Sequence, residues 1–512
     1  MSENENAAVY FVDRHVSEGR ADKTAFREAG SGRSLTYGAL AQETGRVADA
    51  LARADIRREE RAVMLVLDQI EFPPIFWGAL KAGVLPIPLN TLLSTAVYSA
   101  ILRDCRAAIL FVSKDLLPVV LPATEGCENL RHIVVIGDEA PAGTQTFDDF
   151  MAGAEERPAI YADPDEVAFW LYSSGSTGQP KGVRHVHGAL RATSDTYGAQ
   201  VLGIREDDVV YSVAKLFFAY GLGNGMTFPM SVGATTVLYP GRPTPDSATG
   251  ILATERPTVF CGVPTLYAAL VHHWQTAGGH PDVPLRTCIS AGEALPEQVG
   301  KAWRDLWGVD IMDGVGSTEM LHIFLSNKPG DVVYGTSGTA VPGYDVRLVD
   351  EAGADVGLGE VGELLVRGAS AADGYWNQRD KSRATFEGHW TRTGDKYERT
   401  SDGRFVYCGR TDDMFKVSGI WVSPFEIEQA LVSHPAVLEA AVVARRDDDG
   451  LEKPRAFVVL KPGQDRAVLA ELKEFVKDKI GKWKYPRWID VVDDLPKTAT
   501  GKIQRFKLRE DA

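Results

Sequence analysis

Short runs of Val, Ile and Leu recur along the N-terminal part of the chain, separated by longer stretches of mixed polarity. The runs are RAVMLVL at residue 61, AAILFVS at 107, HIVVIG at 132, EVAFWLY at 166, ATTVLY at 234, TVFCGV at 258 and RTCISAG at 286. Several are apolar on both faces instead of alternating, which is typical of strands covered by helices on both sides of a sheet. We therefore predict an α/β fold for this part.

The pattern changes after residue 330. The stretches DVRLVD, GELLVR and GRFVYCGR are short and separated by Gly and Asp turns, which favours antiparallel or barrel-like β structure. Beyond the polar stretch GRTDD, a strand-like KPRAFVVL precedes LAELKEFVKDKI, a helix with one apolar stripe. A tail of about a hundred residues has the size of a small domain. We predict that it is an α+β domain.

The length and the charge of the chain limit the classes of protein to which it could belong. At 512 residues the chain exceeds the usual size of a single hydrophobic core, so two or more domains are expected. Its 44% hydrophobic and 24% charged residues are ordinary for a folded globular protein. A formal net charge of -15 argues against a surface that binds nucleic acid through clustered Lys and Arg.

No segment of the sequence has the pattern of an export signal or a membrane span. The N-terminal MSENENAAVY is polar and acidic and lacks the basic and apolar parts of a secretory signal. The most apolar early stretch, residues 64–89, is interrupted by charges and prolines, which excludes it as a bilayer span. We therefore expect a cytoplasmic protein without membrane contact.

The five cysteines lie singly, without the paired spacing of a zinc or redox site. We expect reduced thiols that fill the core at Cys105, Cys127, Cys261, Cys288 and Cys408.

A loop rich in hydroxyl groups and glycine follows the run EVAFWLY. The stretch YSSGSTGQPKG, residues 172–182, contains three serines, a threonine, three glycines and a lysine. Small residues let backbone N–H groups approach an anion, hydroxyls add donors, and Lys181 adds positive charge, so the composition suits a polyphosphate site. It is not a Walker A loop, because Gly182 follows the lysine. Composition alone favours a flexible surface turn equally.

The order of the residues separates these alternatives. The loop resembles the phosphate loop of the ANL superfamily of adenylate-forming enzymes, which includes acyl- and aryl-CoA synthetases, adenylation domains of peptide synthetases and luciferases. Five further stretches match in the family's order: SAGEALP (290–296), DGVGSTE (313–319), TGD (393–395), GRTDDMFKVSG (409–419) and PKTATGK (496–502). The resemblance implies a large N-terminal domain (1–408), a hinge (409–413) and a small mobile C-terminal domain (414–512).

The resemblance also implies a reaction in which ATP activates a carboxylate as an acyl-AMP before a thiol displaces AMP. ATP, Mg²⁺ and coenzyme A would take part. The positions that match the phosphate-binding residues are Ser173, Ser174, Ser176, Thr177 and Lys181. Glu319 matches the Mg²⁺ ligand, and an oxygen ligand beside phosphate and water suits that ion. Thr318 would donate to the α-phosphate.

Seven positions match the part of the family site that holds adenosine: Gly292, Glu293, Ala294, Asp313, Gly314, Asp395 and Arg410. The small residues would let the adenine lie flat against the backbone. Asp395 would accept hydrogen bonds from the ribose hydroxyls, beside Arg410. Gly292 and Gly314 follow strand-like runs, where ligands of α/β proteins gather, which favours binding over simple turns.

The C-terminal part matches the family's mobile elements. Lys502 matches the catalytic lysine that offsets negative charge on the carboxylate and the α-phosphate, and Asp412 matches the hinge. We expect the small domain to rotate after adenylation, which would withdraw Lys502 and bring Lys416 and Gly419 to a tunnel for the pantetheine of CoA.

The acid is indicated by the stretch KLFFAYGLGNG (215–225) together with GVGSTEMLHIFLSN (314–327), which resemble the benzoate–CoA ligase branch. This resemblance implies a ring pocket made by Phe218, Ala219, Tyr220, Gly316, His322 and Ile323. No Lys or Arg lies between Phe217 and Gly225, so we expect an uncharged ring. Core packing is an equal explanation for Phe217, and a lone histidine such as His322 is more often a packing residue.

The main interpretation is an ATP-dependent aryl–CoA ligase acting on benzoate or a ring-substituted benzoate. Its alternatives are a ligase that loads the phosphopantetheine of a carrier protein, a luciferase-like oxidase, and a nucleotide-binding relic without activity. The expected partners are an aromatic carboxylate, ATP and CoA, without nucleic acid, in a monomer or a homodimer.

Overall fold

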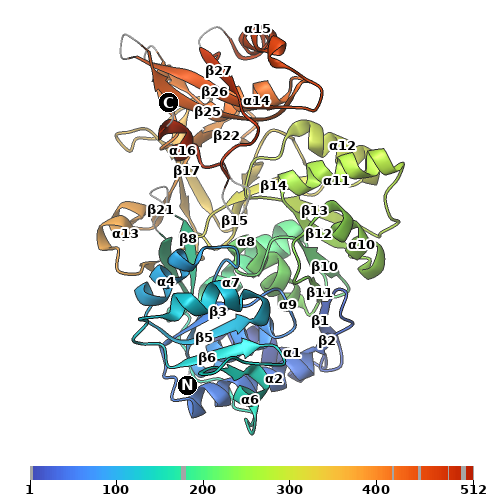
Figure 1. Ribbon diagram of the computed structural model, residues 1–512, viewed down its shortest axis with the longest axis vertical. Coiled ribbons are helices and arrows are strands. Elements are labelled where there is room, and N and C mark those ends of the chain that lie inside the picture. Colours follow the sequence, from blue (N-terminus) through green and yellow to red (C-terminus); the bar gives the residue numbers. More distant parts are fainter. Residues whose placement is uncertain are drawn as a thin grey trace. The chain divides into compact units, whose positions relative to one another are not determined.

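The chain forms two compact units (Figure 1). The computed structural model describes residues 4–174, 180–417, 420–447, 451–481, 484–497 and 503–510. Unit 1 contains Met1–Asp345 and Val366–Thr391, and unit 2 contains Val346–Leu365 and Arg392–Ala512. The predicted fold class, a large α/β part followed by a smaller α+β part, is confirmed. The hinge at 409–413 remains a prediction.

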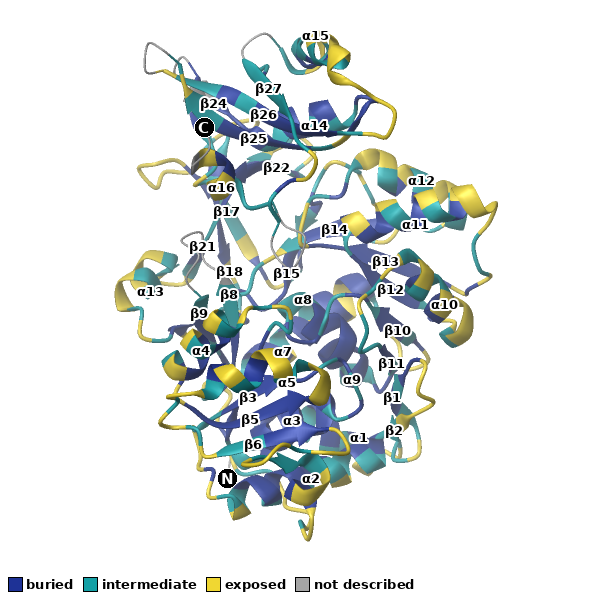
Figure 2. Ribbon diagram, in the orientation of Figure 1, coloured by how far each residue is buried: buried dark blue, intermediate teal, exposed yellow. Residues whose placement is uncertain are grey.

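A five-stranded parallel sheet forms the first layer of unit 1. Its order is β4 (Leu85–Pro88), β3 (Arg61–Leu65), β5 (Ala107–Ser113), β6 (His132–Ile136) and β7 (Gln145–Thr146). Alternate side chains of β3 enter two different cores, with Met64 beside helices α2 (Tyr37–Arg53) and α3 (Phe72–Ala82) and Val63 beside α4 (Thr95–Asp104). Figure 2 shows β3 and β5 buried between these helices. This explains why residues 62–65 of β3 and 107–112 of β5 are apolar at every position.

A nine-stranded sheet forms the second layer of unit 1. Its order is β16 (Thr339–Ala340), β15 (Ile323–Ser326), β14 (Ile311–Gly316), β13 (Thr287–Ser290), β12 (Val259–Gly262), β10 (Val209–Ser212), β11 (Thr235–Leu238), β1 (Thr24–Glu28) and β2 (Ser34–Thr36). The strands from β14 to β1 run parallel, and β2, β15 and β16 are antiparallel. Helices α10 (Pro245–Glu255), α11 (Pro264–Ala277) and α12 (Glu297–Trp307) share a hydrophobic core with this sheet.

Six of the seven apolar runs are strands of these two parallel layers, as predicted. The seventh run belongs to a separate antiparallel sheet of order β19 (Gly374–Tyr375), β9 (Pro180–Val186) and β8 (Val167–Ser174). Strand β8 is apolar on both faces because Phe169 enters one hydrophobic core and Trp170 enters the other.

The other helical elements of unit 1 are short. They are α1 (Arg14–Ser17), α5 (Leu117–Val120), α6 (Phe147–Met151), α7 (His187–Thr193), α8 (Ala219–Leu222), α9 (Phe228–Val232), α13 (Arg379–Thr385), and the 3-10 and π segments η1 (Val9–Asp13), η2 (Lys114–Leu116), η3 (Leu121–Thr124), η4 (Ser194–Leu202) and η5 (Gly223–Thr227).

Unit 2 ends in an α+β fold, as predicted. A sheet of β25 (Val437–Arg446), β26 (Glu452–Leu460) and β27 (Trp488–Val491) packs against α14 (Pro424–Val432) and α15 (Leu469–Ile480). The remaining elements of this region are β23 (Phe415–Val417), β24 (Ile420–Val422), η6 (Arg466–Val468) and α16 (Arg505–Glu510). The predicted helix at LAELKEFVKDKI is α15.

In the sequence, strands joined by short turns follow the sheets of unit 1 and precede the C-terminal α+β fold, as the change of pattern after residue 330 indicated. They are β17 (Asp345–Val349), β18 (Gly362–Arg367), β20 (Phe386–Glu387), β21 (Trp390–Arg399) and β22 (Phe405–Arg410). Antiparallel pairing joins β21 to both β20 and β22.

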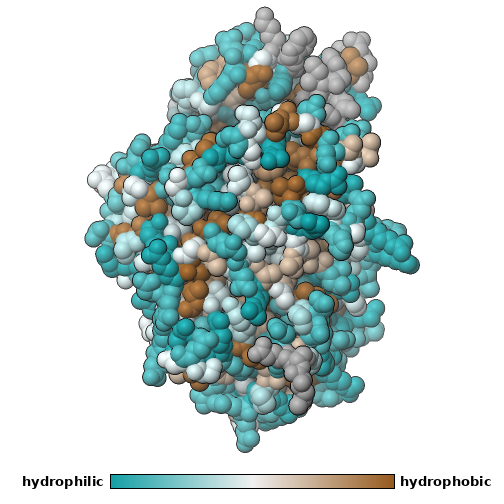
Figure 3. Space-filling model, turned by 180° about the vertical axis from the view of Figure 1, so that it is seen from behind, coloured by the Kyte–Doolittle hydropathy of each residue, from teal (hydrophilic) through white to brown (hydrophobic). Residues whose placement is uncertain are grey.

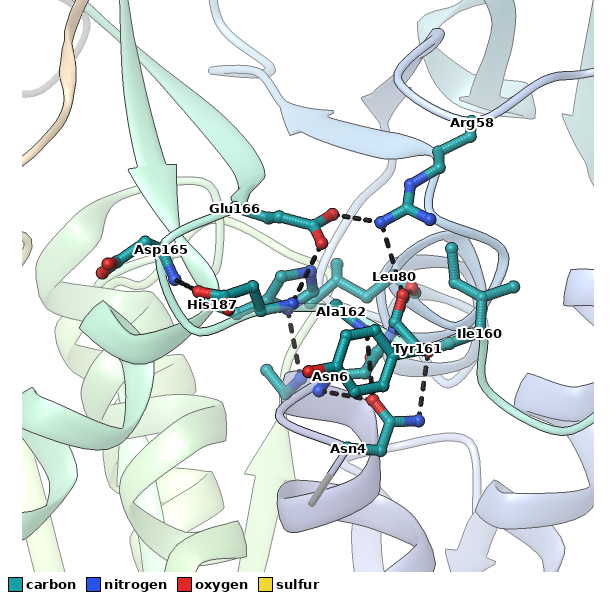
Figure 4. A network of polar contacts seen from close by, with 12 residues as sticks. Asn4, Asn6, Arg58, Leu80, Ile160, Tyr161, Ala162, Asp165, Glu166 and His187 are labelled. Carbon is teal, nitrogen blue, oxygen red and sulfur yellow. Dashed lines mark hydrogen bonds and ion pairs between the residues drawn. The ribbon is translucent and has the colours of Figure 1, made fainter. Parts of the chain in front are cut away.

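The N-terminal segment is held against unit 1 by a polar network that we call the N-terminal clasp (Figure 4). Asn6 Nδ2 donates to the backbone carbonyls of Leu80, at 2.8 Å, and Ile160, at 3.3 Å. Asn4 also donates to Ile160, and the N–H of Ala7 donates to Nδ1 of His187 at 3.1 Å. Asn6 and His187 are 1% and 5% exposed, so the clasp replaces water for these groups.

The described part of the chain contains no helix long and apolar enough to cross a membrane. Figure 3 shows a face on which hydrophilic residues predominate and hydrophobic residues lie in small groups. All five cysteines are free thiols, and four of them are buried as predicted. Cys127 is only partly buried and packs at the edge of the core that contains residues of α4.

Candidate nucleotide and acyl site

The predicted phosphate loop joins two antiparallel strands. Ser173, near the end of β8, lies opposite Lys181 in β9, and the backbone of Ser174 pairs with Pro180. Ser176 and Thr177 lie outside the described residues, as does the side chain of Ser174. The described residues on either side of the loop are therefore paired strands of a β-hairpin.

Hydrogen bonds with residues outside the hairpin, through side chains and backbone, fix its strands. The hydroxyl of Tyr172 donates to Asp104 at 2.5 Å, and the N–H of Trp376 donates to the carbonyl of Gly182 at 2.8 Å. The indole of Trp376 also donates to the Asp104 carbonyl at 2.9 Å. Each strand of the hairpin therefore has an anchor next to the loop.

Lys181 and Glu319 form an ion pair, although 138 residues separate them in sequence. Lys181 Nζ lies 3.1 Å from Glu319 Oε1 and 3.1 Å from the hydroxyl of Tyr375. That hydroxyl donates to the same Glu319 oxygen at 2.8 Å. The structure thus brings together two of the predicted site residues and adds Tyr375, which the sequence analysis missed.

The electrostatics of this group favour an ionised carboxylate. Burial alone would raise the pKa of Glu319, but Lys181 and the Tyr375 hydroxyl hold it below its usual range. The side chains of Lys181 and Glu319 are 14% and 15% exposed, so their charges interact in a partly desolvated place. Nearby on β8, the buried hydroxyl of Ser173 has no partner among the described residues.

A tight turn carries Thr318 and Glu319 after β14. The N–H of Leu321 donates to the Thr318 carbonyl at 3.1 Å, and Leu321 has a left-handed φ of 65°. The N–H of Ala372 donates to the Glu319 carbonyl at 2.8 Å. The backbone of Glu319 is therefore fixed by a neighbouring segment, independently of its side chain.

The predicted adenine residues lie around the carboxyl ends of β13 and β14. Gly292 follows β13 with a φ of 97°, a conformation that favours glycine. Asp313 is 7% exposed and its Oδ2 accepts from the N–H of Leu295 at 3.3 Å, while Oδ1 has no partner among the described residues. Burial raises the pKa of Asp313 to about 8. Glu293 is exposed and Ala294 half-buried.

Two glycines of the predicted site, Gly314 and Gly316, lie inside β14, although Gly314 was expected to follow a strand. Gly314 pairs with Ser326 and Gly316 with Ile323 of β15. A Cβ at Gly316 would lie 2.4 Å from the carbonyl oxygen of His322, so the close approach of the two strands requires glycine there. This packing role is present whether or not these positions also face a ligand.

The predicted ribose residues Asp395 and Arg410 are paired in unit 2. They lie opposite each other on β21 and β22, and Arg410 Nη1 is 3.0 Å from Asp395 Oδ1. The same nitrogen donates to the carbonyl of Thr393 at 3.0 Å. Burial alone would lower the pKa of Arg410, but the neighbouring Asp395 raises it above its usual range. Binding of ribose by this pair remains a prediction.

Tyr220 and His322, two of the predicted ring-pocket residues, are in contact. The hydroxyl of Tyr220 donates to the carbonyls of Gly262, at 3.0 Å, and Ile289, at 3.2 Å. Nε2 of His322 lies 3.3 Å from the Tyr220 carbonyl, so this nitrogen carries the proton. Burial lowers the pKa of His322 to about 3. The histidine is therefore neutral.

Aromatic rings surround His322. Its centroid lies 4.5 Å from that of Phe228 and 5.1 Å from that of Tyr197. A Cβ at Gly223 would lie 2.4 Å from the imidazole, so only glycine leaves room for this ring. The packing of His322 and its predicted place in the ring pocket are compatible.

The other ring-pocket candidates lie at the starts of helix α8 and strand β15. Phe218 is half-buried and contacts Phe217, with centroids 4.4 Å apart and the rings tilted by 56°, and Ala219 begins α8. Ile323 is 1% exposed at the start of β15. Pocket roles for these residues remain predictions.

The predicted mobile residues are only partly described. Lys502 and Gly419 lie outside the described residues, as does the side chain of Lys416. Asp412 is exposed in a turn, where its carbonyl accepts from Arg509 at 3.1 Å. Their catalytic, tunnel and hinge roles remain predictions.

Comparisons with known proteins identify the family. The sequence profile of the AMP-binding enzymes matches residues 12–376, and that of the AMP-binding enzyme C-terminal domain matches residues 426–502. A 4-hydroxybenzoate–CoA/benzoate–CoA ligase of Rhodopseudomonas palustris is 54% identical over 99% of this chain and 94% of its own. A benzoate–CoA ligase of Thauera aromatica is 51% identical over 99% of this chain and 96% of its own.

A solved structure extends the similarity to three dimensions. The crystal structure of a benzoate–CoA ligase from Burkholderia xenovorans matches 98% of this chain and 99% of its own, with 49% identity and a TM-score of 0.90. The sequence, the fold and the Lys181–Glu319 pair at the hairpin are all consistent with the same family. The chain therefore belongs to the adenylate-forming AMP-binding enzymes, on the branch that contains these benzoate–CoA ligases.

Proposed function

We propose that this protein is an ATP-dependent aryl–CoA ligase that activates benzoate or a close ring-substituted benzoate. The observation that carries the proposal is the pairing of Lys181 with Glu319 beside the hairpin of Ser173. Relatives that are more than half identical over the whole chain, both named as benzoate–CoA ligases, support the substrate class.

The reaction has two steps. A carboxylate oxygen of the acid attacks the α-phosphorus of ATP, the bond to the β-phosphate oxygen breaks, and an acyl-AMP and pyrophosphate form. The sulfur of CoA, after loss of its proton, attacks the acyl carbon, and AMP leaves. Both steps move negative charge onto phosphate oxygens, so fixed positive groups and hydrogen-bond donors are the main requirement.

Several residues fit the requirement for fixed positive groups and hydrogen-bond donors. Lys181 would turn from Glu319 to the β- and γ-phosphates, where the unpartnered hydroxyl of Ser173 would add a donor. Thr318, on the turn next to Glu319, would donate to the α-phosphate. Asp395 and Arg410 would hold the ribose, and residues 292–294 with Asp313 and Gly314 would hold the adenine.

Glu319 suits a Mg²⁺ ion that is held mainly by phosphate and water. Among the described residues no group of three His, Cys, Asp or Glu side chains is arranged to hold a metal. One ionised, partly buried carboxylate is nevertheless the donor that Mg²⁺ uses together with substrate phosphates. The bound ion would neutralise charge on the phosphates.

An uncharged aromatic ring suits the pocket candidates. Because the hydroxyl of Tyr220 is committed to two backbone carbonyls, Tyr220 would offer its ring face to the substrate. The neutral His322 adds no charge that would bind a second carboxylate. These observations favour benzoate and small ring-substituted analogues over dicarboxylic acids.

The alternatives have less support. Relatives of benzoate–CoA ligase type match this chain along its length, which favours free CoA over a carrier protein. Lys181, Glu319 and Lys502 are all present, which disfavours an inactive relic. A luciferase-like oxidase would consume oxygen after adenylation.

The function is tested by measuring pyrophosphate release across aromatic and aliphatic acids, with and without CoA, followed by detection of the thioester. We expect release and thioester with benzoate and small substituted benzoates. Turnover confined to medium-chain fatty acids would contradict the aryl assignment.

The role of Lys502 and of the hinge is tested with Lys502→Ala. Loss of one charge-stabilising donor typically lowers the rate by roughly 10²- to 10³-fold. We expect that loss in formation of benzoyl-AMP, while supplied benzoyl-AMP and CoA are still converted to the thioester. Equal loss in both half-reactions would contradict a lysine that acts only in the first.

A further inference from the structure

We propose that Tyr375 is a positioning residue of the phosphate site, which holds the carboxylate of Glu319 in place when Lys181 leaves it for a nucleotide. The inference rests on the proposed binding of ATP at this hairpin. It assigns a role to a residue that lies outside every motif recognised in the sequence.

The hydroxyl of Tyr375 contacts both charged groups. It lies 3.1 Å from Lys181 Nζ and donates its proton to Glu319 Oε1 at 2.8 Å. The ammonium also lies over the tyrosine ring, 4.4 Å from the centroid. Tyr375 therefore contacts Lys181 through its ring as well as its hydroxyl.

The ring of Tyr375 is fixed by its surroundings. The residue is 4% exposed and packs against Phe386 with centroids 5.4 Å apart. Its N–H donates to the hydroxyl of Ser382 at 3.0 Å, and strand β19 pairs Tyr375 with Val183 of β9. A hydroxyl on a ring held in this way occupies one position.

The segment that carries Tyr375 is also bonded to both partners through the backbone. Ala372 donates to the carbonyl of Glu319 and Trp376 to that of Gly182, each at 2.8 Å. Ser370 Oγ donates to the carbonyl of Met320 at 2.7 Å. Residues 370–376 thus join the turn of Glu319 to the strand of Lys181, with the Tyr375 hydroxyl between the two charges.

This arrangement has a consequence for nucleotide binding. When phosphates draw Lys181 away, Glu319 loses a cation but keeps the hydrogen bond from Tyr375. Since the hydroxyl occupies Oε1, the carboxylate presents Oε2 in a fixed direction. A phenylalanine would leave the Glu319 carboxylate without the hydrogen bond from residue 375, and its orientation would be less restricted.

The test is nucleotide binding by Tyr375→Phe, without the acid and without turnover. Calorimetric titrations with ATP alone and with ATP plus Mn²⁺ separate the contribution of Lys181 from that of Glu319. Loss of a hydrogen bond to a charged group typically lowers the binding affinity by roughly tenfold or more. We expect Tyr375→Phe to weaken the Mn²⁺-dependent part of ATP binding about tenfold and binding of ATP alone much less.

Two controls keep the result interpretable. Thr385→Val removes a hydroxyl that lies 3.4 Å from that of Tyr375 without touching Glu319, and it should leave both titrations unchanged. In turnover assays, Tyr375→Phe should raise the KM for ATP and leave the KM for benzoate unchanged.

An unchanged ratio of the two titrations, or an equal change of both KM values, would overturn the proposal. If the wild-type protein binds ATP with Mn²⁺ but forms no aryl thioester, the proposed substrate is wrong while the titration still decides the role of Tyr375. If the wild type binds no ATP, the proposed function fails first.

Discussion

The two ends of strand β9 carry polar networks of opposite character. At the start, Lys181 is bound by the side chains of Glu319 and Tyr375. Just beyond the end, His187 accepts from the backbone N–H of Ala7 in the N-terminal clasp, and Asn6 donates to backbone carbonyls (Figure 4). The first network is built on a charged pair of side chains, whereas the bonds of Asn4, Asn6 and His187 join neutral side chains to the backbone.

The difference distinguishes a ligand-binding site from a purely structural contact. In the clasp each bond replaces a lost contact with water, and no ligand could compete without unfolding the segment. Lys181 is bound by the carboxylate of Glu319, and phosphate oxygens could replace that carboxylate as its partner. The hydroxyl of Ser173 has no partner among the described residues. We therefore expect substitutions at the start of β9 to change catalysis and those at its end to change stability.

The largest expected effect follows from Lys181→Gln. The substitution keeps a polar chain of similar length but removes the positive charge from the proposed phosphate site. Loss of such a group typically lowers the rate of the chemical step by roughly 10²- to 10³-fold. We expect this loss in pyrophosphate release with benzoate, while the free energy of unfolding changes by less than about 2 kcal/mol.

The matched variant at the other end is Asn6→Ala, which leaves buried backbone groups unpaired. Such losses cost roughly 1 to 3 kcal/mol, so denaturant unfolding should report a fall of that size. The rate per folded molecule should stay within about twofold. The comparison fails if Asn6→Ala lowers the rate as strongly as Lys181→Gln does.

A smaller effect concerns the pH dependence of stability. Burial lowers the pKa of His187 to about 4; Glu166 opposes this shift with a weaker raising effect, and Arg58 adds to it. Between pH 6.5 and 4 the unfolded chain binds a proton at His187 that the folded chain does not. This contribution to stability is therefore complete above pH 6.5 and is lost as the pH falls towards 4.

His187→Gln removes that titration. The unfolding free energy of the variant should fall less steeply with decreasing pH than that of the wild type, by at most about 1.4 kcal/mol per pH unit. Parallel curves for the two proteins over this range would contradict a neutral, buried His187.

The sequence predicted the layers well because their signal is local. The first six residues of AAILFVS are all apolar because their side chains are divided between two cores, and this pattern is visible without knowledge of the partners. The antiparallel pairing of β8 was not predicted, because an apolar strand looks the same in either kind of sheet. The helix 469–480 was found from its stripe.

The site was predictable where family motifs exist. Lys181 and Glu319 were found from the stretches YSSGSTGQPKG and DGVGSTE, and the structure joins them. Tyr375 was missed, since a tyrosine in a two-residue strand has no periodic signal and its role depends on a contact with residues far away in sequence. Tyr172 and Trp376, which anchor the hairpin, were missed for the same reason.

The most direct test of the account is a crystal structure with a non-hydrolysable ATP analogue and Mg²⁺. We predict that the β- and γ-phosphates lie within hydrogen-bonding distance of Lys181 and Ser173, with Lys181 released from Glu319 and the Tyr375 hydroxyl still bound to it. A triphosphate located away from the 173–181 hairpin, with the pair of Lys181 and Glu319 intact, would contradict the account.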